Sequence, residues 1–172
     1  MPSSTAAAWP SPGRFALGLG LGFALTLTAA WLWGVALVEA LLPLAHVLLG
    51  WIDARFSILF LGVEHNWQDT VVRLQVTPIS MFVMGGQVIE AHPQGWLEVT
   101  TTTGAMLQTP VIAPAIAIAL PGALRTRMFA FMLATLLALG FLIVDLPLTL
   151  HAYVWDIFVD HLEPDRFSPL LG

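Results

Sequence analysis

The sequence predicts a small α-helical membrane protein, with about three transmembrane helices and a small extracytoplasmic β-rich unit between the first two. Three observations predict this fold class. Hydrophobic residues make up 58% of the 172 residues and charged residues only 10%, whereas soluble domains average about 45–50% and 25%. Long apolar runs recur along the chain, and about 20 such residues are enough to cross a hydrocarbon core. Between the first two runs, short segments separated by turn residues replace the helical pattern.

Residues 1–14 are small, polar and proline-containing, and we expect them to form a cytoplasmic tail that ends in Arg14. The next run, 15–38, contains no charged side chain and is predicted to be the first transmembrane helix. The apolar region of a signal peptide is about 7–15 residues long. The longer run here therefore favours an uncleaved signal anchor over a signal that is cleaved near Ala30.

Small side chains recur at every fourth position of this run: Gly18, Gly22, Thr26, Ala30 and Gly34. A second row of small residues lies beside them: Gly20, Ala24 and Thr28. Residues four apart stack on one face of a helix, so the first row predicts a shallow groove along the helix. Small residues let two membrane helices approach closely. The groove therefore predicts helix packing, within this chain or against a partner, and a general abundance of Gly and Ala in membrane helices is the plainer alternative.

Segment 39–52 remains apolar but contains Pro43, and it predicts an interfacial helix at the membrane surface or a kinked extension of the first helix. Residues 53–103 are predicted to form the β-rich unit. Four short runs lead to this prediction: Arg55–Val63, Thr70–Thr77, Met81–Ile89 and Trp96–Thr103. Apolar and polar residues alternate in the second run, which is typical of a half-buried strand. Gly85 and Gly86 within the third run indicate a hairpin turn.

Two further apolar runs follow the β-rich unit. Run 104–124 contains three prolines and predicts a broken second transmembrane helix, with a re-entrant helix as the alternative because the run is barely long enough. A basic cytoplasmic turn, 125–127, is expected to lead into a third transmembrane helix, 128–150. The last segment, 151–172, combines acidic residues with apolar residues at helical spacing, and it predicts an extracytoplasmic amphipathic tail.

Three arginines near the ends of the predicted helices set the expected topology. Arg14, Arg125 and Arg127 lie in short segments, whereas the other three arginines are spread over longer ones. Basic residues in short loops favour the cytoplasmic side. We therefore expect a multi-pass protein of the bacterial inner (plasma) membrane whose N-terminus is cytoplasmic.

Asp145 is an ionisable residue inside an apolar run, and such a residue is by default a functional candidate. It lies near the outer end of its run, and Pro147 follows two residues later. The plainer interpretation is therefore an interfacial aspartate that caps a following helical segment. A role in proton transfer or partner binding is the alternative.

Other chemically interesting side chains form weaker patterns. Two histidines and an aspartate of the β-rich unit have metal-ligating side chains, but their spacing matches no compact ligand pattern; they are His65, Asp69 and His92. Met81 and Met84 suggest either a soft-metal site together with His92 or core packing, which is the more common use of methionine. Glu39 and His46 lie seven residues apart on one helical face, without a nucleophile that would make them a catalytic pair. The sequence thus predicts no metal site, no catalytic residues and no cofactor.

Composition also restricts the possible partners. The chain has no cysteine, which excludes disulfides and thiolate chemistry. It has no lysine and a net charge of −5, and it lacks the basic patch that nucleic-acid binding requires. The expected partners are therefore membrane lipid and another membrane protein or a second copy of the chain.

The stretch VIAPAIAIALPGALRTRMFAFMLATLLALGFLIVDLPLTL resembles the later helices of small bacterial membrane proteins that accompany exosortases. The order of a helix, a β-rich outer segment, a proline-containing helix, a basic turn and a helix is similar too. The resemblance covers about half the chain and implies an accessory subunit in protein sorting at the bacterial envelope. The resulting hypothesis is a non-enzymatic accessory or assembly subunit of an envelope complex, and an oligomeric channel or transporter component is the alternative.

Overall fold

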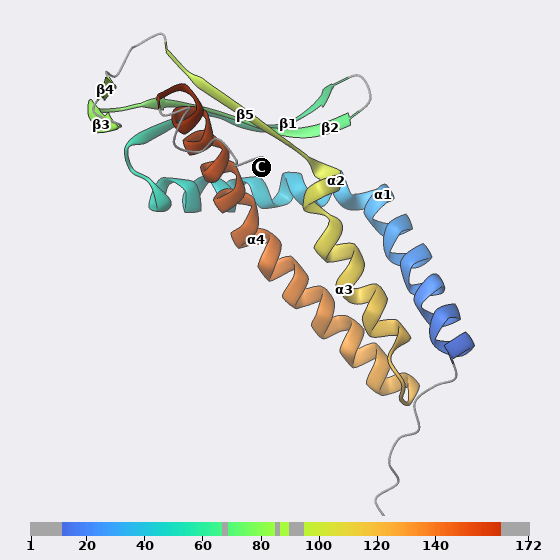
Figure 1. Ribbon diagram of the computed structural model, residues 1–172. Coiled ribbons are helices and arrows are strands. Elements are labelled where there is room, and N and C mark those ends of the chain that lie inside the picture. The colour runs from blue at the N-terminus through green and yellow to red at the C-terminus, as the bar shows by residue number, and fades with distance from the viewer. Residues whose placement is uncertain (1–11, 67–68, 85–86, 90–94, 163–172) are drawn as a thin grey trace, which may run out of the picture. The chain divides into compact units, whose positions relative to one another are not determined.

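A computed structural model describes most of the chain, namely residues 12–66, 69–84, 87–89 and 95–162. The elements follow in this order (Figure 1): α1 (Pro12–Ile52), β1 (Phe56–Asn66), β2 (Asp69–Pro78), β3 (Phe82–Met84), β4 (Gln87–Ile89), β5 (Leu97–Thr102), α2 (Thr103–Met106), α3 (Gln108–Ala119) and α4 (Leu124–Leu162). The chain divides into two compact units. The helical unit comprises Met1–Val35 and Met106–Leu142, and the sheet unit comprises Ala36–Ala105 and Ile143–Gly172.

The predicted combination of apolar helices with a small sheet is confirmed, but the number of long helices differs from the expectation. Within the described residues, α1 and α4 are long and apolar enough to cross a membrane. The predicted second transmembrane helix, 104–124, is shorter. Apolar helix extends there only over Thr103–Ala119, about 25 Å at 1.5 Å per residue, whereas a hydrocarbon core is about 30 Å thick. By this measure, among the described helices only α1 and α4 are long enough to cross a membrane.

Both long helices run past the boundaries that the sequence predicts. α1 continues through Pro43 to Ile52, so segment 39–52 is the extension of the first helix rather than a separate one. A proline removes only one backbone N–H donor. The neighbouring turns keep their hydrogen bonds, so the helix continues through Pro43. α4 likewise continues through Pro147 to Leu162, so 151–162 belongs to this helix. Residues 163–172 of the predicted tail lie outside the described residues.

The predicted basic turn at 125–127 is wrong in position. α4 begins at Leu124, so Arg125 and Arg127 lie in its first turn. The connection from α3 is instead made by residues 120–123, where Gly122 has a φ of +145°. Only glycine adopts this backbone conformation without strain, which explains why the helix can end and reverse here.

The sheet unit contains an antiparallel three-stranded sheet in the order β1-β2-β5. The predicted alternation in β2 is confirmed: Val72, Leu74 and Val76 are buried, at 0–3% exposure. Their neighbours Arg73 and Gln75 lie on the opposite, polar face. One face of the sheet therefore forms core, and the other carries charge.

A second, two-stranded sheet pairs β3 with β4. Met84 pairs with Gln87 at the end of this ladder, so the two strands flank the glycine pair that indicated a hairpin turn. Gly85 and Gly86 themselves lie outside the described residues. The predicted single run Met81–Ile89 is thus two short strands.

Candidate functional site

The predicted groove on α1 is filled by α3 of the same chain. Gly22 is buried, and a Cβ atom placed on it would lie only 2.6 Å from the backbone oxygen of Ala115. Thr26 is 7% exposed, and its hydroxyl donates a hydrogen bond to the Gly22 carbonyl at 2.9 Å. Ala30 is half-buried. The groove therefore packs helices within the chain, which is one of the two alternatives that the sequence left open.

The two ends of the groove show that α1 and α3 are antiparallel. A Cβ atom on Gly18 would lie 3.4 Å from the Cα atom of Ala119, at the end of α3. A Cβ atom on Gly34 would lie 2.5 Å from Cδ1 of Leu107, which immediately precedes α3. The small-residue row therefore follows α3 along its whole length.

This antiparallel packing brings three predicted topology residues to one end of the helical unit. Arg14 precedes Gly18 by one helical turn, and Gly18 contacts Ala119. A four-residue connection leads from Ala119 to α4, whose first turn contains Arg125 and Arg127. Figure 1 shows the start of α1 beside the α3–α4 connection.

The second row of small residues lies on a different face of α1. Gly20, Ala24 and Thr28 are all exposed, and a Cβ atom on Gly20 would have no other atom within 4 Å. Thr28 donates its hydroxyl hydrogen bond to the Ala24 carbonyl at 2.7 Å. The two rows, which look equivalent in the sequence, thus differ in environment.

Asp145 does not cap a helical segment, because α4 is continuous on both sides of it. Its side chain is half-buried in the sheet unit. The capping interpretation is wrong, since Pro147 interrupts only one backbone hydrogen bond and does not end the helix. The role of Asp145 stays a prediction.

The weaker candidates do not converge. His65 and Asp69 are exposed, and His92 lies outside the described residues. No group of three metal-ligating side chains occurs among the residues that are described. Met81 is 65% exposed, so it is not core packing.

Glu39 and His46 do lie on one side of α1, as their spacing predicts. Together with Leu42, Pro43 and Leu61 they line a shallow surface groove in the sheet unit. Both side chains are exposed. Glu39 and His46 therefore lie on an exposed polar face of α1.

A further polar cluster, absent from the candidates named above, forms where α1 ends and β1 begins. Asp53 follows the last residue of α1, and its side chain is 6% exposed. Arg55 donates two side-chain hydrogen bonds to the Asp53 carboxylate, from Nε and Nη2, each at 2.7 Å. These bonds hold the pKa of the Asp53 carboxyl below its usual value, although partial burial acts in the opposite direction.

α4 completes this cluster. The Arg55 guanidinium stacks over the Trp155 ring, 4.7 Å from its centroid, which is a favourable cation–π distance. Trp155 also contacts the Phe56 ring edge-on, with centroids 6.0 Å apart. His151 Nε2 lies 4.0 Å from Asp53 Oδ2, beyond hydrogen-bond distance. The cluster thereby joins the α1–β1 corner to α4.

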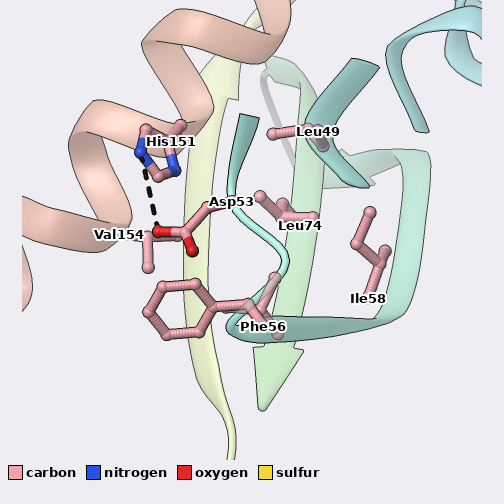
Figure 2. A pocket seen from close by; sticks show the side chains of 8 residues that line it. Leu49, Asp53, Phe56, Ile58, Leu74, His151 and Val154 are labelled. Atoms are coloured by element: carbon pink, nitrogen blue, oxygen red, sulfur yellow. Dashed lines mark ion pairs between the residues drawn. The ribbon is translucent and has the colours of Figure 1, made fainter. Parts of the chain in front are cut away.

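A small cavity of about 20 Å³ lies beside Asp53 and His151 (Figure 2). Apolar side chains form most of its wall, including Leu49, Leu74 and Val154. This volume suffices for one water molecule and is far below the 300–1,000 Å³ of ligand pockets. The geometry therefore supports a structural role for the cluster, which fixes α4 against the sheet, and not substrate binding.

A local sequence signal for this cluster does exist. An aspartate directly after a helix, with an arginine two residues later, places both side chains at the same corner. The partners on α4, about 100 positions further along the chain, are brought there by tertiary packing alone. Sequence spacing gives no sign of them.

A second charged network occupies the polar face of the sheet. Arg73 on β2 pairs with Glu64 on β1 at 2.8 Å and with Glu98 on β5. Gln75 donates a further hydrogen bond to Glu98 at 3.0 Å. The bonds from Arg73 and then from Gln75 lower the pKa of Glu98. The network ties the three strands together on the solvent side.

Over its described residues, the chain has two apolar helices of membrane-spanning length and a small antiparallel sheet that is polar on one face. Comparisons of the chain with protein-family models, with curated proteins and with solved structures find no match.

Proposed function

We propose that this chain is an integral protein of the bacterial inner membrane and acts as an accessory or assembly subunit of an envelope complex. The observation that carries the proposal is the apolar surface of the helical unit. Large apolar side chains on α1 and α4 are more than half exposed, among them Leu21, Leu25, Leu136 and Leu137. Soluble monomers rarely expose contiguous apolar patches larger than a few hundred Å². Lipid is the environment that suits such a surface.

The lengths of α1 and α4 indicate that only part of each helix lies within the membrane. α1 has 41 residues and α4 has 39, about 60 Å each at 1.5 Å per residue. Only about half of either fits a 30 Å core. The charge-free run 15–38 and the run 128–150 are the proposed spanning portions, and the shorter α3 is proposed to return the chain between them.

The shared end of Arg14, Arg125 and Arg127 supports the proposed topology. Basic residues that flank membrane helices favour the cytoplasmic side. With these three in the cytoplasm, the N-terminus is cytoplasmic and the three-stranded sheet is extracytoplasmic. The antiparallel packing of α1 with α3 then explains why all three arginines lie on the same side of the membrane.

Two further surfaces support an accessory role. The row Gly20, Ala24 and Thr28 remains exposed on α1, and small residues allow close approach of a partner helix. The polar face of the sheet offers paired charges and hydrogen-bonding groups outside the membrane. Together with the resemblance to proteins that accompany exosortases, these surfaces favour a partner in protein sorting or export.

Copurification in mild detergent tests the proposal, with two variants that separate a partner interface from internal packing. Gly20→Leu places a large side chain on the exposed row, and Gly22→Leu places the same side chain in the α1–α3 contact. We expect a stoichiometric membrane-protein partner that Gly20→Leu removes while the variant elutes as a folded, monodisperse species. Gly22→Leu is expected to destabilise the chain itself.

Other outcomes discriminate between function classes. A homo-oligomer without another protein would favour the channel or transporter alternative. A monomer for the wild-type chain and for Gly20→Leu would contradict the accessory-subunit proposal. Recovery of the chain in the soluble fraction, without detergent, would contradict its membrane location.

A further inference from the structure

The hairpin of β3 and β4 carries an exposed apolar surface that the proposed function does not use. Four described side chains of this region are more than half exposed: Ile79 at 60%, Met81 at 65%, Val83 at 69% and Val88 at 55%. The sequence from Leu74 to Ile89 contains no charged residue. An exposed apolar patch without charge indicates a contact surface.

The pairing of the strands places the valines together. Val83 and Val88 are directly opposite each other in the antiparallel ladder, and residues opposite each other point to the same face of a sheet. Among the described strands, β3 and β4 pair only with each other and not with the three-stranded sheet. The valine face is therefore not needed to cover the core of the sheet unit.

We propose that this hairpin is a second membrane contact of the chain and inserts Met81, Val83 and Val88 into the interfacial layer of the lipid bilayer. The proposal rests on the membrane anchoring proposed above, because an anchored chain keeps the bilayer within permanent reach of its extramembrane unit. A lipid surface requires apolar side chains and an absence of charge, and the hairpin has both.

Neighbouring features of the same unit agree with a lipid partner. α1 exposes Leu44, Val47 and Trp51 at helical spacing on the part that extends beyond its proposed spanning portion. Trp51 is 81% exposed, and Trp96, just before β5, is 59% exposed. Tryptophan is enriched at the boundary between hydrocarbon and water. The unit thus has apolar side chains suited to an interface on more than one element.

The backbone sets the depth of insertion. The outer edges of a two-stranded hairpin have unpaired N–H and C=O groups, which are costly to place in hydrocarbon. The hairpin therefore stays in the headgroup region, where water and lipid oxygens satisfy those groups. Only the side chains reach the acyl boundary.

Site-directed spin labelling of the full chain tests this contact. The sequence has no cysteine, so a single introduced cysteine takes the label at one position. Val83→Cys reports on the hairpin in vesicles of phosphatidylethanolamine and phosphatidylglycerol. Leu25→Cys on α1 is the lipid control, and Thr100→Cys on the exposed polar face of β5 is the water control.

The measured quantity is the ratio of label accessibility to oxygen, which concentrates in lipid, and to a water-soluble nickel complex. We expect this ratio at Val83 to be several-fold higher than at Thr100 and to approach the ratio at Leu25. A ratio at Val83 equal to that at Thr100, with Leu25 lipid-like, would overturn the hairpin contact and leave the membrane anchoring intact. Low accessibility to both reagents would also overturn it, because a protein would then cover the hairpin.

A water-like ratio at Leu25 would refute the membrane anchoring itself. Val88→Cys provides an independent reading of the same face if the Val83 variant does not fold. The two valines are cross-strand partners, so their ratios should agree. Opposite results at the two positions would contradict insertion of a common face.

Discussion

The two rows of small residues on α1 allow a direct test of the helix packing. Gly20 and Gly22 lie two positions apart in the same helix, but only Gly22 faces α3. Substitution of either by alanine adds one methyl group and changes the helix propensity by the same amount, about 1 kcal/mol in favour of alanine in water. A comparison of the two variants therefore cancels propensity and isolates the contact.

The structure gives the size of the difference. The new Cβ atom at Gly22 would lie 2.6 Å from the Ala115 oxygen and 3.1 Å from its Cα atom. Both are backbone atoms, so the two helices must move apart. Such overpacking costs about 1–3 kcal/mol. At Gly20 the methyl group meets nothing within 4 Å and costs nothing.

The assay is thermal unfolding in mild detergent, monitored by tryptophan fluorescence. A chain of this size changes its Tm by about 2–4 °C per kcal/mol. We therefore expect Gly22→Ala to unfold about 2–12 °C below Gly20→Ala. Gly34→Ala should lie between them, because the clashing atom is the mobile end of the Leu107 side chain. Equal Tm values for Gly20→Ala and Gly22→Ala would refute the packing of α3 in the groove.

Three further substitutions test other parts of the fold. Leu74→Ala should lower the free energy of unfolding by about 2–5 kcal/mol, because the side chain is 1% exposed; a loss below 1 kcal/mol in denaturant titration would contradict its place in the core. Gly122→Ala should destabilise the chain because of the positive φ, whereas Gly140→Ala, within α4 and with nothing within 4 Å, should not; the two Tm values are compared. Asp53→Asn should make the stability of the chain depend less on pH under acidic conditions. A carboxyl whose folded pKa is lowered by Arg55 contributes stability above its usual pKa of about 4, and this contribution is lost as the pH falls through the folded pKa. The Tm of the wild-type chain should therefore fall more steeply than that of Asp53→Asn between about pH 5 and pH 2, and parallel curves would show that the pair with Arg55 does not form.

The sequence by itself determined the elements that depend on local pattern. Long apolar runs predicted the two long helices, because such a composition over more than 20 residues has few other structural uses. The run 104–124 predicted a third in the same way, but the helix described there is shorter. Alternation around Leu74 predicted the central strand, and the glycine pair predicted the β3–β4 hairpin. Spacing of four predicted that Gly18, Gly22 and Gly34 share a face. Each of these predictions depends on periodicity along one element.

Only the tertiary structure decided how those elements meet. Both rows of small residues satisfy the same spacing rule, and the position of α3 determines which one is buried. Pro43 and Pro147 suggested boundaries, but α1 and α4 continue through them. The cluster of Asp53, Arg55 and Trp155 joins residues that are distant in sequence. The physical reason is common to all three cases: local pattern specifies the surfaces that an element presents, whereas the free energy of burial depends on the distant element that covers them.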